Sequence, residues 1–280
     1  MSPTAFQLTT RRGDFRVAVD GDPAAPALIL SNSLGTTLEM WAPQVAALSA
    51  RYRLIRYDTR GHGGSPITPG PYRVDVLGQD VLAVLDALQV EQAAFCGISM
   101  GGHTGLWLGI HASTRMHAIV VCNSAAKIGT SQGWGERAAV LRAKGADGMQ
   151  ALADSAPARW FSEACIQTQP AMVRHLQDGL AHLDPEGYAS CCDALAASDL
   201  RSELGRIAIP TLLLAGQCDP VCTVADAQAM QASIPGAQQV TVPASHLSNL
   251  EAPQAFNQAV LDFLANVCSL KGKTCCTWSI

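Results

Sequence analysis

The stretch Phe95-Cys96-Gly97-Ile98-Ser99-Met100-Gly101-Gly102-His103 decides the fold of this 280-residue chain. An apolar run over residues 93–98 predicts a buried strand, and residues 104–108 begin a helical pattern. A G-x-S-x-G motif between a strand and a helix is typical of a nucleophile elbow, in which a strained turn points the serine hydroxyl away from the sheet. A serine in an ordinary glycine-rich turn is the alternative. The strand before the motif and the helix after it favour a catalytic role for Ser99.

The rest of the chain alternates strand and helix patterns around this motif. Short apolar runs predict strands at residues 6–8, 15–19, 27–30, 52–57, 117–122, 211–216 and 239–242. A turn at Arg12-Gly13-Asp14 is expected to join the first two. Helical patterns lie at residues 41–48, 74–88, 224–234 and from 253 to about 267. This alternation predicts one large α/β domain whose mostly parallel sheet is flanked by helices.

Strand patterns stop between residues 123 and 207, where the sequence is rich in alanine and helical in pattern. A helical insertion inside an α/β alternation is most simply interpreted as a lid over the site. We therefore expect residues 1–123 and 207–268 to form the two parts of the core, with the helical lid at residues 124–206. Residues 269–280 form a tail without an assignment.

Composition excludes several classes of partner. The formal net charge of −4 argues against nucleic acid or an anionic membrane surface. No apolar run reaches 18 residues, so no membrane-spanning helix is expected. The ten cysteines are scattered and form no C-x-x-C pair. We therefore expect reduced thiols in a cytoplasmic protein, and neither a metal site nor a disulfide framework.

Three side chains follow the carboxyl ends of predicted strands, which meet at one edge of a parallel sheet. Ser99 ends one strand, Asp219 follows the strand at 211–216, and His246 follows the strand at 239–242. The order Ser, Asp, His is the one expected for a hydrolase with a nucleophile elbow. In such a triad the histidine takes the serine proton, and the aspartate holds the histidine tautomer. The competing residues, which are less well placed, are His62, His103, Asp193, Asp199 and Asp226.

With these residues in view, the chain resembles the α/β-hydrolase superfamily over about residues 5–267. Within it, the chain is similar to the 3-oxoadipate enol-lactone hydrolases of the β-ketoadipate pathway. The narrower resemblance rests on the segment from Ser31 to Trp41, on Tyr57-Asp58-Thr59-Arg60-Gly61-His62-Gly63, and on residues 97–102. Many relatives carry His-Gly where this chain has Asn32-Ser33, and the Asn-Ser-Leu-Gly form resembles the enol-lactonases.

The resemblance implies that an acyl-serine on Ser99 carries the hydrolysis of 3-oxoadipate enol-lactone to 3-oxoadipate in aromatic catabolism. The small-molecule lactone is then the partner, and neither a metal nor an organic cofactor is needed. The backbone N–H groups of Leu34 and Met100 are expected to form the oxyanion hole. The resemblance also marks the turn around His62 as structural.

The lid supplies our expected substrate-binding residues. Trp134 and Arg137 are three residues apart in a predicted helix and therefore share a face. We expect Trp134 to pack on the lactone ring and Arg137 to bind the carboxylate arm, with Arg174 or Lys127 as the next candidates. The alternative is that these lid side chains are exposed to solvent and bind no ligand.

Two other functions fit the same sequence. One is a broader carboxylesterase, perhydrolase or C–C bond hydrolase with the same triad. The other is a non-enzymatic sensor that binds a lactone on this fold.

Overall fold

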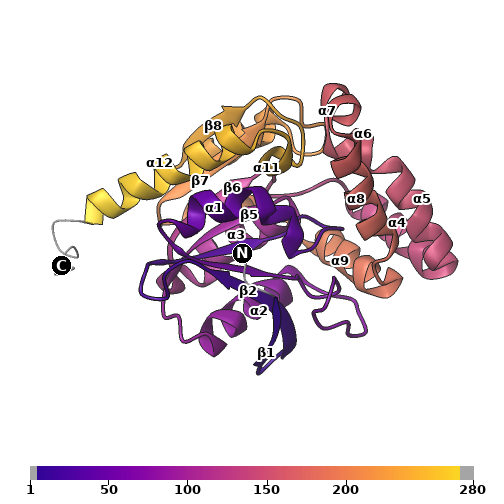
Figure 1. The fold of residues 1–280 in the computed structure, drawn as a ribbon, viewed down its shortest axis with the longest axis horizontal. Helices are drawn as coiled ribbons and strands as arrows, with labels where there is room; N and C mark the ends of the chain where they lie inside the picture. Colours follow the sequence, from indigo (N-terminus) through magenta and orange to yellow (C-terminus); the bar gives the residue numbers. More distant parts are fainter. Residues whose placement is uncertain (1–4, 272–280) are drawn as a thin grey trace.

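The computed structural model describes residues 5–271, with side chains described as far as Val267. Eight strands form one sheet in the order β1-β2-β4-β3-β5-β6-β7-β8. The β1–β2 and β2–β4 pairs are antiparallel, and the other neighbouring pairs are parallel. The strands are β1 (Phe6–Thr10), β2 (Gly13–Asp20), β3 (Ala27–Ser31), β4 (Arg53–Tyr57), β5 (Ala93–Ile98), β6 (Met116–Cys122), β7 (Thr211–Gly216) and β8 (Gln238–Val242). The expected α/β fold with a mostly parallel sheet is therefore confirmed (Figure 1).

Helices cover both faces of this sheet. Successive side chains of a strand point to opposite faces, and apolar side chains on each face need a layer of helices to cover them. Leu28 and Leu30 of β3 pack in one apolar cluster with α1 and α12, while Ile29 packs in a second cluster with α2, α3 and α10. The helices of the core are α1 (Ala42–Ser49), α2 (Val74–Ala87), α3 (Met100–His111), α10 (Val224–Ser233), α11 (Ser248–Glu251) and α12 (Pro253–Lys271). Short 3-10 helices are η1 (Leu38–Trp41), η2 (Ser113–Arg115) and η3 (Arg201–Arg206).

A helical insertion connects β6 to β7, where the sequence predicted it. Figure 1 shows its helices gathered beside one end of the sheet. Its apolar side chains join the same cluster as α1 and α12, so the insertion packs directly on that side of the core. The helices are α4 (Ser131–Lys144), α5 (Ala146–Ser155), α6 (Pro157–Trp160), α7 (Glu163–Thr168), α8 (Pro170–Ala181) and α9 (Pro185–Ala197). The division into core and lid at residues 123/124 and 206/207 stays a prediction.

Two element boundaries differ from the expectation. Gly13 and Asp14 belong to β2, because they pair with Thr10 and Thr9 of β1, so the turn comes earlier than expected. Helix α12 continues to Lys271 instead of ending near 267, and therefore takes in the first residues of the expected tail. The remainder of that tail, residues 272–280, lies outside the described residues.

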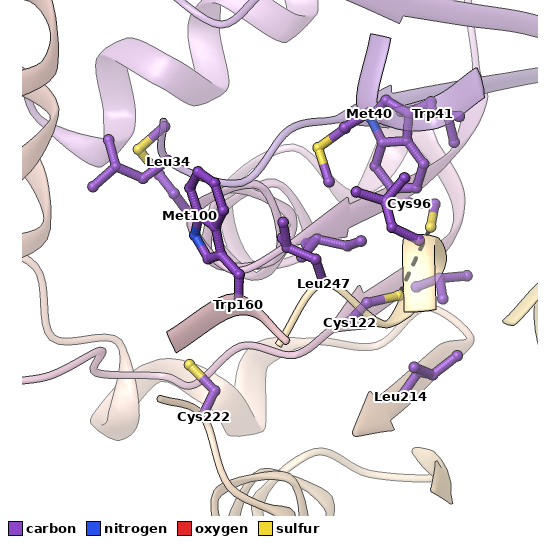
Figure 2. Packing of buried hydrophobic residues seen from close by; sticks show 14 of the residues in the cluster. Leu34, Met40, Trp41, Cys96, Met100, Cys122, Trp160, Leu214, Cys222 and Leu247 are labelled. Carbon is purple, nitrogen blue, oxygen red and sulfur yellow. Dashed lines mark hydrogen bonds between the residues drawn. The ribbon is translucent and has the colours of Figure 1, made fainter. Parts of the chain in front are cut away.

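The cysteines whose side chains are described are free thiols, and all of them except Cys218 are buried. Cys96 and Cys122, on neighbouring strands, place their Sγ atoms 3.9 Å apart in the apolar cluster (Figure 2). Burial raises the pKa of Cys122, which favours the neutral thiol. Within residues 5–271 no helix has the length and apolarity needed to cross a membrane, and no group of side chains has a metal-binding arrangement.

Candidate active site

Ser99 occupies a strained turn between β5 and α3. Its φ of 56° and ψ of −115° lie in a region that residues other than glycine rarely adopt. The Ser99 N–H donates to the Cys122 carbonyl at 2.9 Å, and the Ser99 carbonyl accepts from Ser124 Oγ and from the His103 N–H, both at 2.8 Å. These bonds on both sides of the residue hold the turn, as is common where strain is kept at a functional site.

Glycine is required on both sides of the serine. A Cβ atom on Gly97 would lie 2.4 Å from the Gly101 carbonyl carbon, and one on Gly101 would lie 2.2 Å from the Ser31 oxygen. Backbone atoms fill both places, so no side chain can move to make room. The two glycines of G-x-S-x-G therefore let β5, α3 and the loop after β3 come into contact.

Asp219 and His246 lie at the carboxyl ends of β7 and β8. His246 Nδ1 is 2.9 Å from Asp219 Oδ2. The other carboxylate oxygen, Oδ1, accepts the N–H groups of Val221 at 2.7 Å and Cys222 at 3.1 Å. The backbone therefore fixes the orientation of the carboxylate that faces the histidine.

Asn123 is a site residue that our sequence reasoning missed. It follows β6 with a φ of 46°, and its N–H donates to the Leu214 carbonyl. Its Nδ2 donates to Asp219 Oδ2 at 3.0 Å and to the Ser245 carbonyl at 3.1 Å. Its Oδ1 accepts from Ser248 Oγ. A polar residue directly after a buried strand, at the edge where the triad was expected, was the signal that could have identified it.

The histidine loop is fastened to the helical insertion on both sides. The Ser245 N–H donates to Glu251 Oε2 at 3.0 Å, and the same oxygen accepts the Ser162 N–H at 3.2 Å. The Leu247 N–H donates to the Trp160 carbonyl at 2.9 Å. The two neighbours of the histidine are thus held by the end of α6 and the start of α7: Leu247 directly by Trp160, and Ser245 through Glu251.

The two expected oxyanion donors come from adjacent segments. The Gly101 N–H donates to the Asn32 carbonyl at 3.1 Å, which joins the start of α3 to the loop after β3. Leu34 lies in that loop, and Met100 is the first residue of α3. Within residues 5–271 neither of their N–H groups has a hydrogen-bond acceptor. Both donors are therefore available to an oxyanion.

Asn32 connects the segments on which the narrower resemblance rests. Its Nδ2 donates to the Tyr57 carbonyl at 2.9 Å, and its Oδ1 accepts from Trp41 Nε1 at 2.8 Å. A hydrophobic side chain in its place would leave both of these buried partners without the bonds that Asn32 makes. Asn32 therefore has a structural role in this loop.

The competing histidines serve the scaffold. His62 Nε2 accepts the Gly35 N–H at 2.9 Å, next to Leu34, and its Nδ1 lies 3.3 Å from the Arg60 carbonyl. His103 is buried between the Ala125 carbonyl and Ser198 Oγ. Burial lowers the pKa of His62 to about 4 and also lowers that of His103, so both rings favour the neutral form. Neither ring lines the cavity described below.

His62 leads to a stability prediction with a defined pH window. An unfolded histidine titrates near pH 6.5, so the unfolded chain takes up this proton before the folded chain does. The stability due to neutral His62 is therefore complete above pH 6.5 and is lost as the pH falls towards 4. We expect His62 to account for about 2 to 3 kcal/mol of the loss in unfolding free energy between roughly pH 7.5 and 4.5.

Urea unfolding of wild type and His62→Gln at both pH values measures this loss. His103 is present in both proteins, so its titration cancels in the difference. Equal losses in the two proteins would contradict the prediction.

A cavity of about 300 Å³ opens beside the elbow. Of the predicted site residues, it is lined by Ser99, His246, Leu34, Trp134 and Arg137. Asp219 is buried behind the histidine, and Met100 is buried at the start of α3, where only its N–H is needed. The structure therefore brings the sequence-predicted residues to one place.

The predicted pair on α4 lies as its spacing suggested, with the Arg137 guanidinium 4.7 Å from the centre of the Trp134 ring. Trp134 Nε1 donates to the Ile128 carbonyl at 2.6 Å, which fixes the indole. The two next candidates do not line this cavity. Arg174 is exposed on α8, and Lys127 pairs with Asp199 at 3.4 Å. The binding of the carboxylate arm by Arg137 therefore stays the first prediction for the lid.

Arg159 and Tyr188 also line the cavity, and the sequence analysis did not select either as a site residue. Arg159 belongs to α6, which has only four residues and so shows no periodic face. Tyr188 belongs to α9 and is buried. No sequence signal identified them, because only the folded insertion brings α4, α6 and α9 together.

Comparison with known proteins gives close matches over nearly the whole chain. A family model described as alpha/beta hydrolase fold matches residues 26–253. The chain is 50% identical over 253 residues to 3-oxoadipate enol-lactonase 2 of Acinetobacter baylyi, covering 90% of this chain and 94% of that protein. It is 45% identical over 264 residues to 3-oxoadipate enol-lactonase 1 of the same organism, covering 94% and 98%. The crystal structure of the enol-lactonase from Burkholderia xenovorans LB400 superimposes with a TM-score of 0.90 at 42% identity, covering 93% of this chain and 100% of that one.

Proposed function

The chain belongs to the alpha/beta hydrolase fold family, and we propose that it hydrolyses 3-oxoadipate enol-lactone to 3-oxoadipate through an acyl-serine on Ser99. The observation that carries the proposal is a single cavity lined by Ser99, His246 and Arg137. Relatives named 3-oxoadipate enol-lactonase, at 45% and 50% identity over most of the chain, support the choice of substrate.

In the first step, Ser99 Oγ attacks the lactone carbonyl carbon while His246 Nε2 takes its proton. Asp219, bonded to His246 Nδ1, holds the ring in the required tautomer and stabilises the imidazolium that forms. The negative charge on the former carbonyl oxygen is met by the N–H groups of Leu34 and Met100. The ring C–O bond then breaks and the enol oxygen leaves, taking the proton from His246.

In the second step, a water molecule attacks the acyl-serine and gives a proton to His246. The ester bond to Ser99 breaks, the histidine returns the proton to Oγ, and the new carboxylate is released. The enol tautomerises to the ketone. An enolate is a far better leaving group than an alkoxide, so little assistance from a general acid is required.

This proposal predicts true turnover with a marked substrate preference. We expect kcat/KM for the enol-lactone to fall in the range of about 10⁴–10⁸ M⁻¹s⁻¹ that is typical of enzymes. Because p-nitrophenyl acetate lacks the ring and the carboxylate arm, we expect its kcat/KM to be at least about 100-fold lower. Initial rates on both substrates with wild-type protein measure the difference.

The other two functions give different results in the same assay. Similar values for both substrates would indicate a general esterase. Release of one equivalent of product without further turnover would indicate a lactone-binding sensor. We also propose a cytoplasmic location, which the free thiols of the described residues support because disulfides are rare in that compartment.

A further inference from the structure

We propose that Arg137, Arg159 and Tyr188 form one anion-binding subsite that holds the carboxylate arm of the substrate. This inference rests on the proposed function and deepens it, since it adds two residues to the site and names the group that they bind. The three side chains come from α4, α6 and α9, and all of them line the cavity that holds Ser99 and His246.

The two guanidinium groups carry positive charge that the protein does not neutralise. Within the described residues, neither Arg137 nor Arg159 forms an ion pair with an aspartate or glutamate. By contrast Arg142, also on α4, is paired with Glu186 at 2.8 Å and Asp193 at 2.6 Å. Like charges left together in a partly buried cavity are unfavourable, so the site is suited to an anion.

The electrostatics of Arg159 agree with this placement in one cavity. Burial lowers the pKa of Arg159, and the positive charge of Arg137 lowers it further. An anion between them would remove that repulsion and add charge-assisted hydrogen bonds.

Arg159 is held in place by the end of α5. Its Nη1 donates to the Ser155 carbonyl at 3.0 Å and to Ser155 Oγ at 2.9 Å, and its Nη2 lies 3.4 Å from the Leu152 carbonyl. A guanidinium has five N–H donors, so donors remain for a ligand while the group is already oriented. Capping of α5 alone is the competing explanation, and the experiment below separates the two.

Tyr188 supplies a neutral donor beside the cations. Burial raises the pKa of its phenol, which keeps the hydroxyl protonated. A Cβ on Gly35 would lie 3.2 Å from the Tyr188 ring, so the glycine next to Leu34 makes room for it. The anion subsite and the expected oxyanion loop are therefore in contact.

The subsite has a consequence for the product. Hydrolysis converts the lactone carbonyl into a second carboxylate at Ser99, so the product carries a carboxylate at both ends. We therefore expect adipate, a linear dicarboxylate of the same length, to compete with substrate by using the same two ends of the cavity.

The test compares Arg159→Gln and Arg137→Gln with wild type in two assays. We expect kcat/KM for the enol-lactone to fall by about 10- to 150-fold in each variant, which is the loss of a hydrogen bond to a charged group. We expect this fall to be at least ten times larger than the fall for p-nitrophenyl acetate, which has no carboxylate. The inhibition constant of adipate, measured against p-nitrophenyl acetate, should rise by about tenfold or more. Arg174→Gln, on the exposed face of α8, is the matched control and should leave all three values unchanged.

An inhibition constant for adipate that is the same in wild type and Arg159→Gln would overturn the proposal and leave Arg159 as a helix cap. If Arg159→Gln does not fold, Arg137→Gln tests the same subsite, because Arg137 stacks on Trp134 and does not cap α5. Tyr188→Phe should weaken adipate binding more modestly, by about 3- to 10-fold. Adipate binding is measured without the enol-lactone, so a failure of the proposed substrate would be seen separately from a failure of the subsite.

Discussion

Replacing Ser99 by alanine is expected to lower kcat for the enol-lactone by about 10⁶-fold, which is typical of the loss of a serine nucleophile. The alanine cannot form an acyl intermediate, so only substrate binding and the N–H groups of Leu34 and Met100 remain to assist a direct attack by water. The fold should survive, because the turn is held by backbone bonds of Ser99 and by Ser124, which do not involve the Ser99 hydroxyl.

Intact-mass measurement after treatment with a fluorophosphonate tests the assignment independently of substrate. Wild type should gain the mass of one adduct and Ser99→Ala should gain none. Ser233→Ala, an exposed serine on α10, is the matched control and should be labelled like wild type. Labelling that persists in Ser99→Ala would mean that another residue is the nucleophile.

The sequence predicted most of the fold because the decisive features are local. The strand at 93–98 and the strand at 211–216 were predicted with the bounds that the structure has. Both are short, fully buried runs of apolar residues, and such runs give a clear pattern. The helix at 74–88 was predicted from its apolar face, and Leu77, Val81 and Leu85 are indeed buried.

The candidate site was predicted only where a residue is tied to a strand end. Ser99, Asp219 and His246 follow strands directly, so their meeting follows from sheet topology. Asn123 obeys the same rule and could have been predicted from it. Arg159 could not have been predicted in this way, because its place in the cavity depends on how the six helices of the insertion pack against one another. Helix α6 has only four residues, which are too few to show a periodic pattern.

The loop positions show a second limit of sequence reasoning. His62 was expected to be structural, but nothing in the sequence indicated that it accepts the Gly35 N–H beside an expected oxyanion donor. Residues 35 and 62 are distant in the chain, and the bond forms only because β3 and β4 are parallel neighbours. Contacts between loops at the carboxyl ends of the strands therefore depend on which strands are neighbours in the sheet. The pattern of residues within one strand does not show which strand lies next to it.

Asp219→Asn is expected to lower kcat by about 10⁴-fold, as the same change does in a well-studied serine protease. The reason here is the set of donors around the carboxylate. Oδ1 accepts two backbone N–H groups, from Val221 and Cys222, and these cannot move away. The amide oxygen of an asparagine must therefore take the Oδ1 position, which places its NH₂ group at the Oδ2 position beside His246 Nδ1 and Asn123 Nδ2.

An NH₂ group at that position is a hydrogen-bond donor. It faces His246 Nδ1 and Asn123 Nδ2, which both donate to the carboxylate oxygen in the wild type. His246 can accept from it only if Nδ1 is unprotonated, which moves the ring proton to Nε2, and a protonated Nε2 cannot take the Ser99 proton. The rate of fluorophosphonate labelling should therefore fall together with kcat, while the binding of adipate, which needs neither the attack by Ser99 nor a proton transfer, should be kept. Asp178→Asn, on the exposed face of α8, is the matched control. A loss smaller than about tenfold in both rates would show that His246 does not depend on Asp219 for its tautomer, and the role of Asp219 would then be limited to holding the loops after β6, β7 and β8 together.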